Sequence, residues 1–170
     1  MNEESKKSII EITKDLLQRV GFDGEVKLIE NDFGNSESTE PQINSFTVAV
    51  ESDKDLSILI GKNGQNLNAF DHVVRLLVAR KLGATEEKNP LTFIVDVNDY
   101  RKSRTNYLVE IARNVARRVL QTQKAEALAP MSSYERKLVH TELAGYKEIQ
   151  TESIGQEPRR RIVVKPQLIT

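Results

Sequence analysis

The sequence contains no cysteine and no tryptophan, and its 170 residues include only 8 glycines and 5 prolines. Without cysteine the chain can form no disulfide, and it offers no thiolate as a nucleophile or metal ligand. No stretch approaches the roughly 18 uninterrupted apolar residues that indicate a membrane-spanning helix. The first residues, MNEESKKSII, also lack the apolar run and the small-residue cleavage site of a signal peptide. These absences predict a soluble, cytoplasmic protein with no membrane span.

The chain also has no net charge, because 25 basic residues balance 25 acidic ones, but the charges are unevenly distributed. Residues 1–98 carry 11 Lys and Arg against 17 Asp and Glu (11 − 17 = −6), whereas residues 99–170 carry 14 against 8 (14 − 8 = +6). This split predicts two domains, 1–98 and 99–170, with different surfaces. A basic second half favours a polyanionic partner, although a merely solvated basic face is the simpler alternative.

Helical and strand patterns alternate in the first half. Steps of three and four residues between apolar positions indicate helices, whereas strict alternation indicates half-buried strands. In order, the predicted elements are a helix at 5–20, a strand at 24–32, a polar loop at 34–42, a strand at 43–52, helices at 53–60 and 65–82, a polar segment at 84–90 and a strand at 91–97. The buried stripes are predicted to be Ile9, Ile12, Leu16 and Val20 in the first helix, and Leu67, Phe70, Val74, Leu77 and Val78 in the third.

The second half begins with a long predicted helix at 100–122. A short strand within 126–130, a helix at 131–145 and strands at 146–153 and 159–166 follow. Ser132 and Glu135 have the spacing of a capping box, and Gly145 is suited to the end of the same helix. The fold class is therefore α/β (α+β), with two small domains in series whose element orders are α-β-β-α-α-β and α-β-α-β-β.

The stretch LIGKNGQNL, residues 59–67, places two glycines around a lysine and an asparagine. A P-loop would need a longer glycine loop ending in Lys and Ser/Thr, and a dinucleotide site would need G-x-G-x-x-G after a strand. A G-x-x-G corner between two helices lets the backbone approach a ligand, and the amides that begin the second helix favour an anion. The pattern predicts a phosphate-backbone site at Gly61, Lys62, Asn63 and Gly64, with an ordinary helix corner as the alternative.

A second candidate site is the pair Arg136 and His140, which lie one helical turn apart and share a face. An arginine fork and a histidine so placed can hold neighbouring phosphate oxygens. The alternative is a surface arginine beside a half-buried histidine.

Two further groups of basic residues are less specific candidates. Arg101, Lys102 and Arg104 lie at the junction of the halves, and Arg159, Arg160 and Arg161 precede the last strand. Three adjacent arginines cannot all face one way in an extended chain. Tyr134 is the best-placed aromatic residue for base stacking, but a core or capping role is the favoured interpretation.

The sequence offers little support for catalysis and implies no cofactor. Its only histidines, His72 and His140, belong to no cluster with metal-ligand spacing. Asp96 and Asp99 are the best magnesium pair, but at this spacing near a strand end they would point to different faces. A metal-dependent nuclease is therefore the weakest alternative, and the prediction is that the protein is not an enzyme.

Both motif sets resemble a known family. LIGKNGQNLNAF matches the pattern of KH domains, and APMSSYERKLVH followed by TESIGQEPRRRIVV resembles the R-x3-H domain. With DVNDYRKSR at the junction, nearly the whole chain resembles the bacterial Jag family, the KhpB type of cytoplasmic RNA-binding protein. The resemblance implies a type II KH domain followed by an R-x3-H domain that together bind single-stranded RNA.

The resemblance also implies roles for particular residues. Gly61, Lys62, Asn63 and Gly64 would line the KH site, and the second module would use Arg136, His140, Ser153, Arg159, Arg160 and Arg161. It implies a link to post-transcriptional control of cell envelope growth, elongation and division, and a second small KH protein as a possible partner. A protein-interaction scaffold is therefore the alternative function. Many Jag proteins carry a further N-terminal domain, so functions tied to that domain are not expected of this chain.

Overall fold

The computed structural model describes residues 3–30, 46–83 and 93–167. The chain divides into two compact units, which we call unit 1 (Met1–Arg101) and unit 2 (Lys102–Thr170). The predicted domain boundary between residues 98 and 99 stays a prediction. Each unit is described by itself.

Unit 1 has the element order that the sequence predicts. Its elements are α1 (Glu3–Arg19), β1 (Glu25–Glu30), β2 (Phe46–Glu51), α2 (Ser57–Ile60), a 3-10 turn (Lys62–Gly64), α3 (Gln65–Leu82) and β3 (Phe93–Val97). The predicted bounds of α3 are confirmed, and its end at Gly83 has the left-handed backbone that glycine favours. The prediction that α2 begins at residue 53 is wrong, since the helix is a single turn. The predicted polar segments at 34–42 and 84–90 lie outside the described residues.

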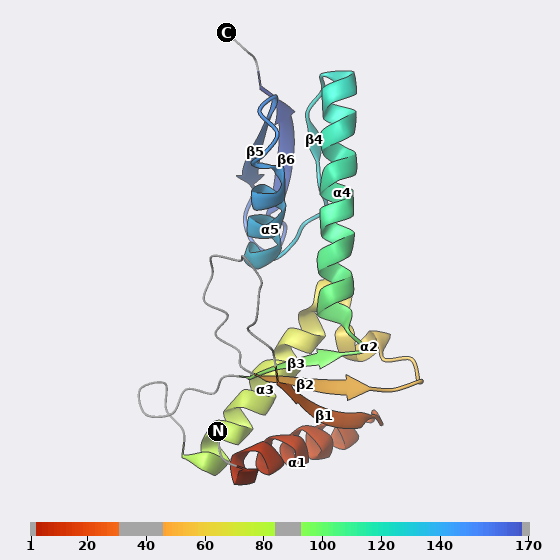
Figure 1. Cartoon of the computed structure of the whole chain (residues 1–170), viewed down its shortest axis with the longest axis vertical. Helices are drawn as coiled ribbons and strands as arrows, with labels where there is room; N and C mark the ends of the chain where they lie inside the picture. Colours follow the sequence, from red (N-terminus) through yellow and green to blue (C-terminus); the bar gives the residue numbers. More distant parts are fainter. Residues whose placement is uncertain (1–2, 31–45, 84–92, 168–170) are drawn as a thin grey trace. The chain divides into compact units, whose positions relative to one another are not determined.

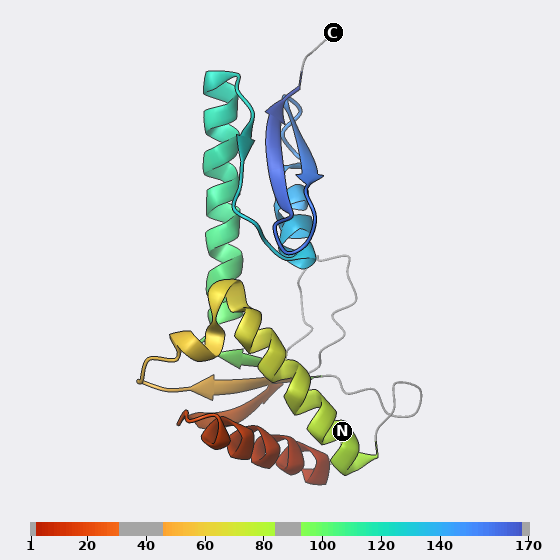
Figure 2. The ribbon, with the colours of Figure 1, turned by 180° about the vertical axis from the view of Figure 1, so that it is seen from behind.

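The three strands of unit 1 form one sheet in the order β1-β2-β3. β1 and β2 pair antiparallel, with Val26 opposite Val50, whereas β2 and β3 pair parallel, with Val48 opposite Val95. α1 and α3 pack against each other and against this sheet (Figures 1 and 2). Because the strands bury one apolar face against the helices, a single core forms between them.

Two predicted stripes need correction. In α1 the buried positions are Ser8, Ile9, Thr13 and Leu17. Val20 lies beyond the end of the helix and is 47% exposed. Thr13 can be buried because its hydroxyl donates a hydrogen bond to the Ile9 carbonyl at 2.8 Å. In α3 the buried stripe runs on in steps of four from Phe70 to Val78, which leaves Leu77 40% exposed.

Unit 2 also has the predicted element order. Its elements are α4 (Tyr100–Thr122), whose first two residues belong to unit 1, then β4 (Glu126–Ala127), α5 (Ser133–Leu143), β5 (Ile149–Ile154) and β6 (Arg161–Pro166). The capping box is confirmed: Ser132 accepts from the Glu135 amide, and the Glu135 carboxylate accepts from the Ser132 amide. The helix ends two residues before Gly145. The strands pair antiparallel in the order β4-β6-β5 over a separate apolar core.

Candidate nucleic-acid interface

The loop at residues 61–64 joins α2 to α3 through left-handed backbone. The φ angles are 71° at Gly61, 55° at Asn63 and 74° at Gly64. Gly64 is the N-cap of α3 and has no side chain to cap it, so the first amides of an 18-residue helix begin beside the loop. Lys62 is exposed. This local geometry can present one cation and a helix start to an anion.

Both glycines of this loop are also required by internal packing. A Cβ atom at Gly61 would lie 2.5 Å from Cγ of Asn66, whose side-chain amide donates to the Ile58 carbonyl at 2.8 Å. A Cβ atom at Gly64 would lie 2.7 Å from Cε1 of Tyr100. The helix-corner alternative therefore accounts for both glycines without a ligand, and Lys62 is the residue of the loop whose exposure suits RNA binding.

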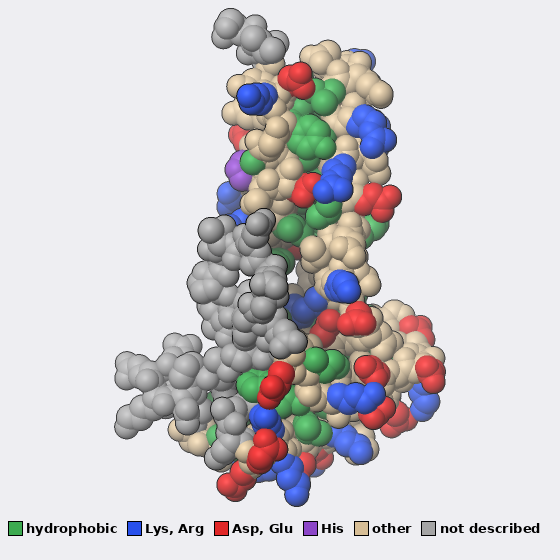
Figure 3. All heavy atoms as spheres, in the orientation of Figure 1, with side chains coloured by type: hydrophobic (Ala, Val, Ile, Leu, Met, Phe, Trp, Pro, Cys, Tyr) green, Lys and Arg blue, Asp and Glu red, His purple; other side chains and the backbone are tan. Residues whose placement is uncertain are grey.

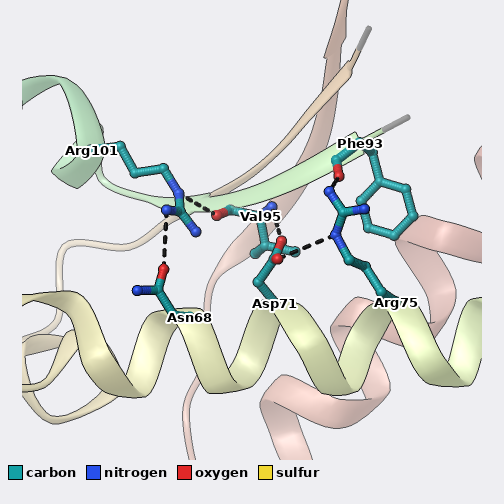
Figure 4. A network of polar contacts seen from close by, with 6 residues as sticks. All are labelled: Asn68, Asp71, Arg75, Phe93, Val95 and Arg101. Carbon is teal, nitrogen blue, oxygen red and sulfur yellow. Dashed lines mark hydrogen bonds and ion pairs between the residues drawn. The ribbon is translucent and has the colours of Figure 1, made fainter. Parts of the chain in front are cut away.

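Polar side chains of α3 and the start of α4 cover the edge of β3 that does not face β2 (Figure 4). The Val95 amide donates to the Asp71 carboxylate at 2.7 Å, and Arg101 Nε donates to the Val95 carbonyl at 3.1 Å. Arg75 pairs with Asp71 and donates to the Phe93 carbonyl. Backbone groups on a sheet edge need partners, and here the protein's own side chains supply them. Arg101, a predicted junction contact, is thus used inside unit 1, where it also binds Asn68 at 3.1 Å.

The remaining charges of unit 1 are mixed in sign, and Figure 3 shows acidic and basic side chains interspersed over its visible face. Lys27 and Lys54 each pair with carboxylates, at 2.7 Å for the closer contacts. Hydrogen bonds from Glu51 and Glu25 raise the pKa of Lys27, and the hydrogen bond from Lys54 lowers the pKa of Asp23. The surface of this unit is therefore poor as a general polyanion site.

Asp96 is buried, and its carboxylate accepts hydrogen bonds from the amides of Val97 and Arg101 at 2.9 and 3.2 Å. Burial raises the pKa of this carboxyl group, and the two backbone hydrogen bonds partly offset that rise. Among the residues that the structure describes, no group of three or more His, Asp or Glu side chains could hold a metal ion.

In unit 2 the guanidinium of Arg136 lies inside the protein. Its side chain is 9% exposed, Nη1 donates to the Met131 carbonyl at 2.8 Å, and Nη2 lies 2.8 Å from Oε1 of Glu157. The interpretation of Arg136 as a surface charge is therefore wrong. His140, one turn later, is exposed, and its Nδ1 is hydrogen-bonded to the Thr151 hydroxyl on β5. So the histidine is not half-buried.

The segment joining β5 to β6, which we call the basic turn (residues 155–161), places arginines at the surface. Arg159 and Arg160 are exposed and Arg161 is half-buried. Arg160 Nε donates to the Ser153 hydroxyl at 3.0 Å, and Arg161 Nε donates to the Arg159 carbonyl at 3.3 Å. The structure thus brings together three arginines and Ser153, all of which the sequence singles out.

The other candidates of unit 2 differ in their engagement. Arg104 pairs with the buried Glu135 at 2.7 Å and its guanidinium lies over the Tyr107 ring, so it supports the start of α5. Lys102 is exposed. Tyr134 is 67% exposed, so the core or capping role favoured from the sequence is wrong, and the ring can stack on a base. Across the described ranges, no helix is long and apolar enough to cross a membrane.

Comparisons with known proteins agree with this geometry. The family model of the R-x3-H domain matches residues 106–166. The chain is 33% identical to "RNA-binding protein KhpB" of Clostridium symbiosum over 126 residues, which are 74% of this chain and 53% of that relative. The match to the protein of the same name from Lactiplantibacillus plantarum is 31% over 163 residues, 96% of this chain and 45% of the relative. For Bacillus subtilis it is 39% over 110 residues, 64% and 50%. The chain spans about half the length of these curated relatives.

Proposed function

Since the chain belongs to the KhpB (Jag) family and contains an R-x3-H domain, we propose that it is a non-catalytic protein that binds single-stranded RNA. Its curated relatives are named RNA-binding proteins. The observation that carries the proposal is the basic turn. Arg159 and Arg160 are exposed on it, and arginine forks recognise phosphate oxygens well.

The neighbourhood of the basic turn supports a strand-binding surface. Exposed His140 uses Nδ1 for Thr151, which leaves Nε2 for a phosphate or a base. Tyr134 on the same helix is an exposed ring, and stacking on such rings is tolerant of base identity. Lys102 is the one predicted junction contact whose exposure still suits RNA. Unit 2 thereby supplies the charge and the aromatic face that sequence-tolerant binding needs.

For unit 1 we propose a type II KH domain in which the loop at 61–64 holds the RNA backbone. The element order and the position of the loop between α2 and α3 support this proposal. Lys62 is the single cation of the loop, and the net charge of residues 1–98 is −6. We therefore assign unit 1 a weak, positioning contribution and unit 2 the larger share of the affinity.

A second candidate function is a protein-interaction scaffold for a small KH protein. One observation favours it: an apolar groove on unit 1 is lined by side chains of α1, α2 and α3, including exposed Ile58 and Val73. A cytoplasmic location and a role in the post-transcriptional control of cell envelope growth, elongation and division also belong to this proposal.

The test is binding of a labelled single-stranded RNA of about 20 nucleotides, followed by fluorescence anisotropy across a salt series. Affinity should fall with salt, by a slope of about 0.7 per neutralised phosphate in a log–log plot. The double variant Arg159→Gln/Arg160→Gln should bind about tenfold more weakly and show a slope smaller by about 1.4. The RNA should remain intact with magnesium, because no catalysis is proposed.

The matched control is Arg117→Gln/Lys124→Gln, which removes the same charge from exposed positions on and after α4. It should reduce affinity by less than about threefold. Equal losses in both double variants would show that binding depends on net charge and not on the basic turn. A protein that binds no RNA but copurifies with a small KH protein would support the scaffold instead.

A further inference from the structure

The burial of Arg136 raises the question of what this cation does. A charge with a 9% exposed side chain must find partners inside the protein, since an unpaired buried charge is strongly destabilising. Its two partners are the Met131 carbonyl and the Glu157 carboxylate, each at 2.8 Å. The first precedes α5, and the second belongs to the basic turn. Arg136 thus joins its own helix to the turn that carries the exposed arginines.

Further hydrogen bonds converge on the same turn. The Met131 amide donates to the Arg160 carbonyl at 3.2 Å, so the residue whose carbonyl binds Arg136 also holds the backbone of Arg160. The Arg159 amide donates to the Gln156 carbonyl at 2.8 Å, and Arg160 Nε donates to the Ser153 hydroxyl. These contacts fix the backbone from which the exposed arginines project.

Glu157 is the unexpected member of this arrangement. It is an acidic side chain, 60% exposed, in a turn whose other charged residues are three arginines. A carboxylate at such a position repels a polyanion and lowers its association rate. Its contact with Arg136 gives it a use that outweighs this repulsion, because preorganised groups lose less entropy when a ligand binds.

We propose that Arg136 is a positioning residue that fixes the basic turn through Glu157, and that the Arg136–Glu157 ion pair is a clamp rather than a phosphate site. This inference rests on the proposed function in that it assigns the turn to RNA. It reverses the expected sign of one substitution: removing the negative charge of Glu157 should weaken RNA binding. If Arg136 were a phosphate ligand, Glu157 would compete with RNA, and removing it would strengthen binding.

The experiment compares Glu157→Ala with Glu148→Ala by anisotropy, using the same labelled RNA. Glu148 is an exposed acid of unit 2 that lies outside the turn. Glu157→Ala should lower affinity about tenfold, as expected when one or two charge-assisted contacts are no longer held in place. Glu148→Ala should leave affinity unchanged or raise it by less than about twofold. Unchanged or higher affinity in Glu157→Ala overturns the clamp.

Glu157→Gln provides a graded test, since its amide oxygen can still accept from Arg136 Nη2. It should bind RNA more tightly than Glu157→Ala. An affinity equal to or below that of the alanine variant would contradict positioning by this contact.

A spectroscopic readout separates the clamp from the proposed function. In RNA-free protein, the backbone amides of Gly155, Arg159 and Arg160 should lose order in Glu157→Ala, seen as a lower ¹H–¹⁵N heteronuclear NOE, while amides of α4 keep theirs. Unchanged values at the turn overturn the clamp whatever RNA does. Loss of order at the turn, in a chain whose wild type binds no RNA, would leave the clamp in place and reject the RNA proposal.

Discussion

The loop at 61–64 and the basic turn at 155–161 both combine glycine with basic residues, but they use them differently. In the loop, Gly61 and Gly64 are packed against Asn66 and Tyr100, and Lys62 is the single cation. In the turn, a Cβ atom at Gly155 would meet nothing closer than 3.5 Å. The turn is instead held by hydrogen bonds and an ion pair, and its arginines point to the surface.

The same contrast extends to the arginines of the two units. Arg75 and Arg101 serve the edge of β3 in unit 1, whereas Arg159 and Arg160 of unit 2 remain exposed. A basic residue in a sequence therefore indicates a nucleic-acid contact only if no backbone carbonyl or carboxylate of the fold needs it. Four substitutions test whether the polar groups of unit 1 serve the fold first and RNA second.

The largest effect is expected from Gly64→Ala. The methyl group would meet the Tyr100 ring and the residue would keep a positive φ angle, so the free energy of unfolding of unit 1 should fall by about 3 kcal/mol. Urea denaturation, followed at NMR amide signals of β3, measures it. Gly83→Ala is the control, because it shares the left-handed backbone but has nothing within 4 Å, and it should cost about 1 kcal/mol.

Equal losses in the two glycine variants would show that Tyr100 does not restrict residue 64. The same packing argues against using Gly64→Asp to test RNA binding, since that variant would disturb the fold before it could repel a phosphate.

The next effect is expected from Asp71→Ala, which removes the acceptor of the Val95 amide and the partner of Arg75. Leaving these groups without partners should lower the free energy of unfolding of unit 1 by about 2 kcal/mol. Hydrogen exchange at the Val95 amide should accelerate accordingly. Asp15→Ala breaks an exposed ion pair of α1 with Arg19 and should have almost no effect. If both variants behave alike, the cover over the β3 edge contributes nothing to stability.

Much of this architecture can be predicted from the sequence. The element order, the bounds of α3 and α4 and the capping box at Ser132 depend on local patterns of apolar spacing, glycine and side-chain caps. The motifs also indicate where candidate residues lie. What they cannot indicate is depth. Arg136 is buried because Met131 and Glu157 meet it in space, and the helical pattern around it contains neither contact.

The cover over β3 was likewise beyond the sequence, because Asp71 and Val95 are 24 residues apart and Asp71 belongs to no motif. The alternation of Phe93, Val95 and Val97 predicts a strand but does not say that one edge lacks a neighbouring strand. A polar residue on a helix that faces such an edge is the signal to look for, and it can be recognised only once the sheet order is known.

A smaller effect is expected from Lys62→Ala, which compares the loop directly with the basic turn. Loss of one exposed phosphate contact should reduce RNA affinity by about threefold and the salt slope by about 0.7. Lys14→Ala, an exposed lysine of α1, is the control and should change neither. A loss in Lys62→Ala as large as that of Arg159→Gln/Arg160→Gln would reverse the comparison and make unit 1 the main RNA site.

The smallest effect is expected from Asp96→Asn and concerns pH alone. Because burial raises the pKa of Asp96, folded unit 1 holds a proton that the unfolded chain has released. The stabilisation from this group is complete below the usual carboxyl pKa and is lost as pH rises through the raised value. Asparagine keeps an oxygen that can accept from the Val97 and Arg101 amides. Urea denaturation from about pH 3 to about pH 7 should show the stability of wild type falling relative to Asp96→Asn, whereas exposed Asp53→Asn should show no such divergence. A constant difference would mean that Asp96 titrates alike in the folded and unfolded states, and RNA affinity at neutral pH should be the same in all three proteins.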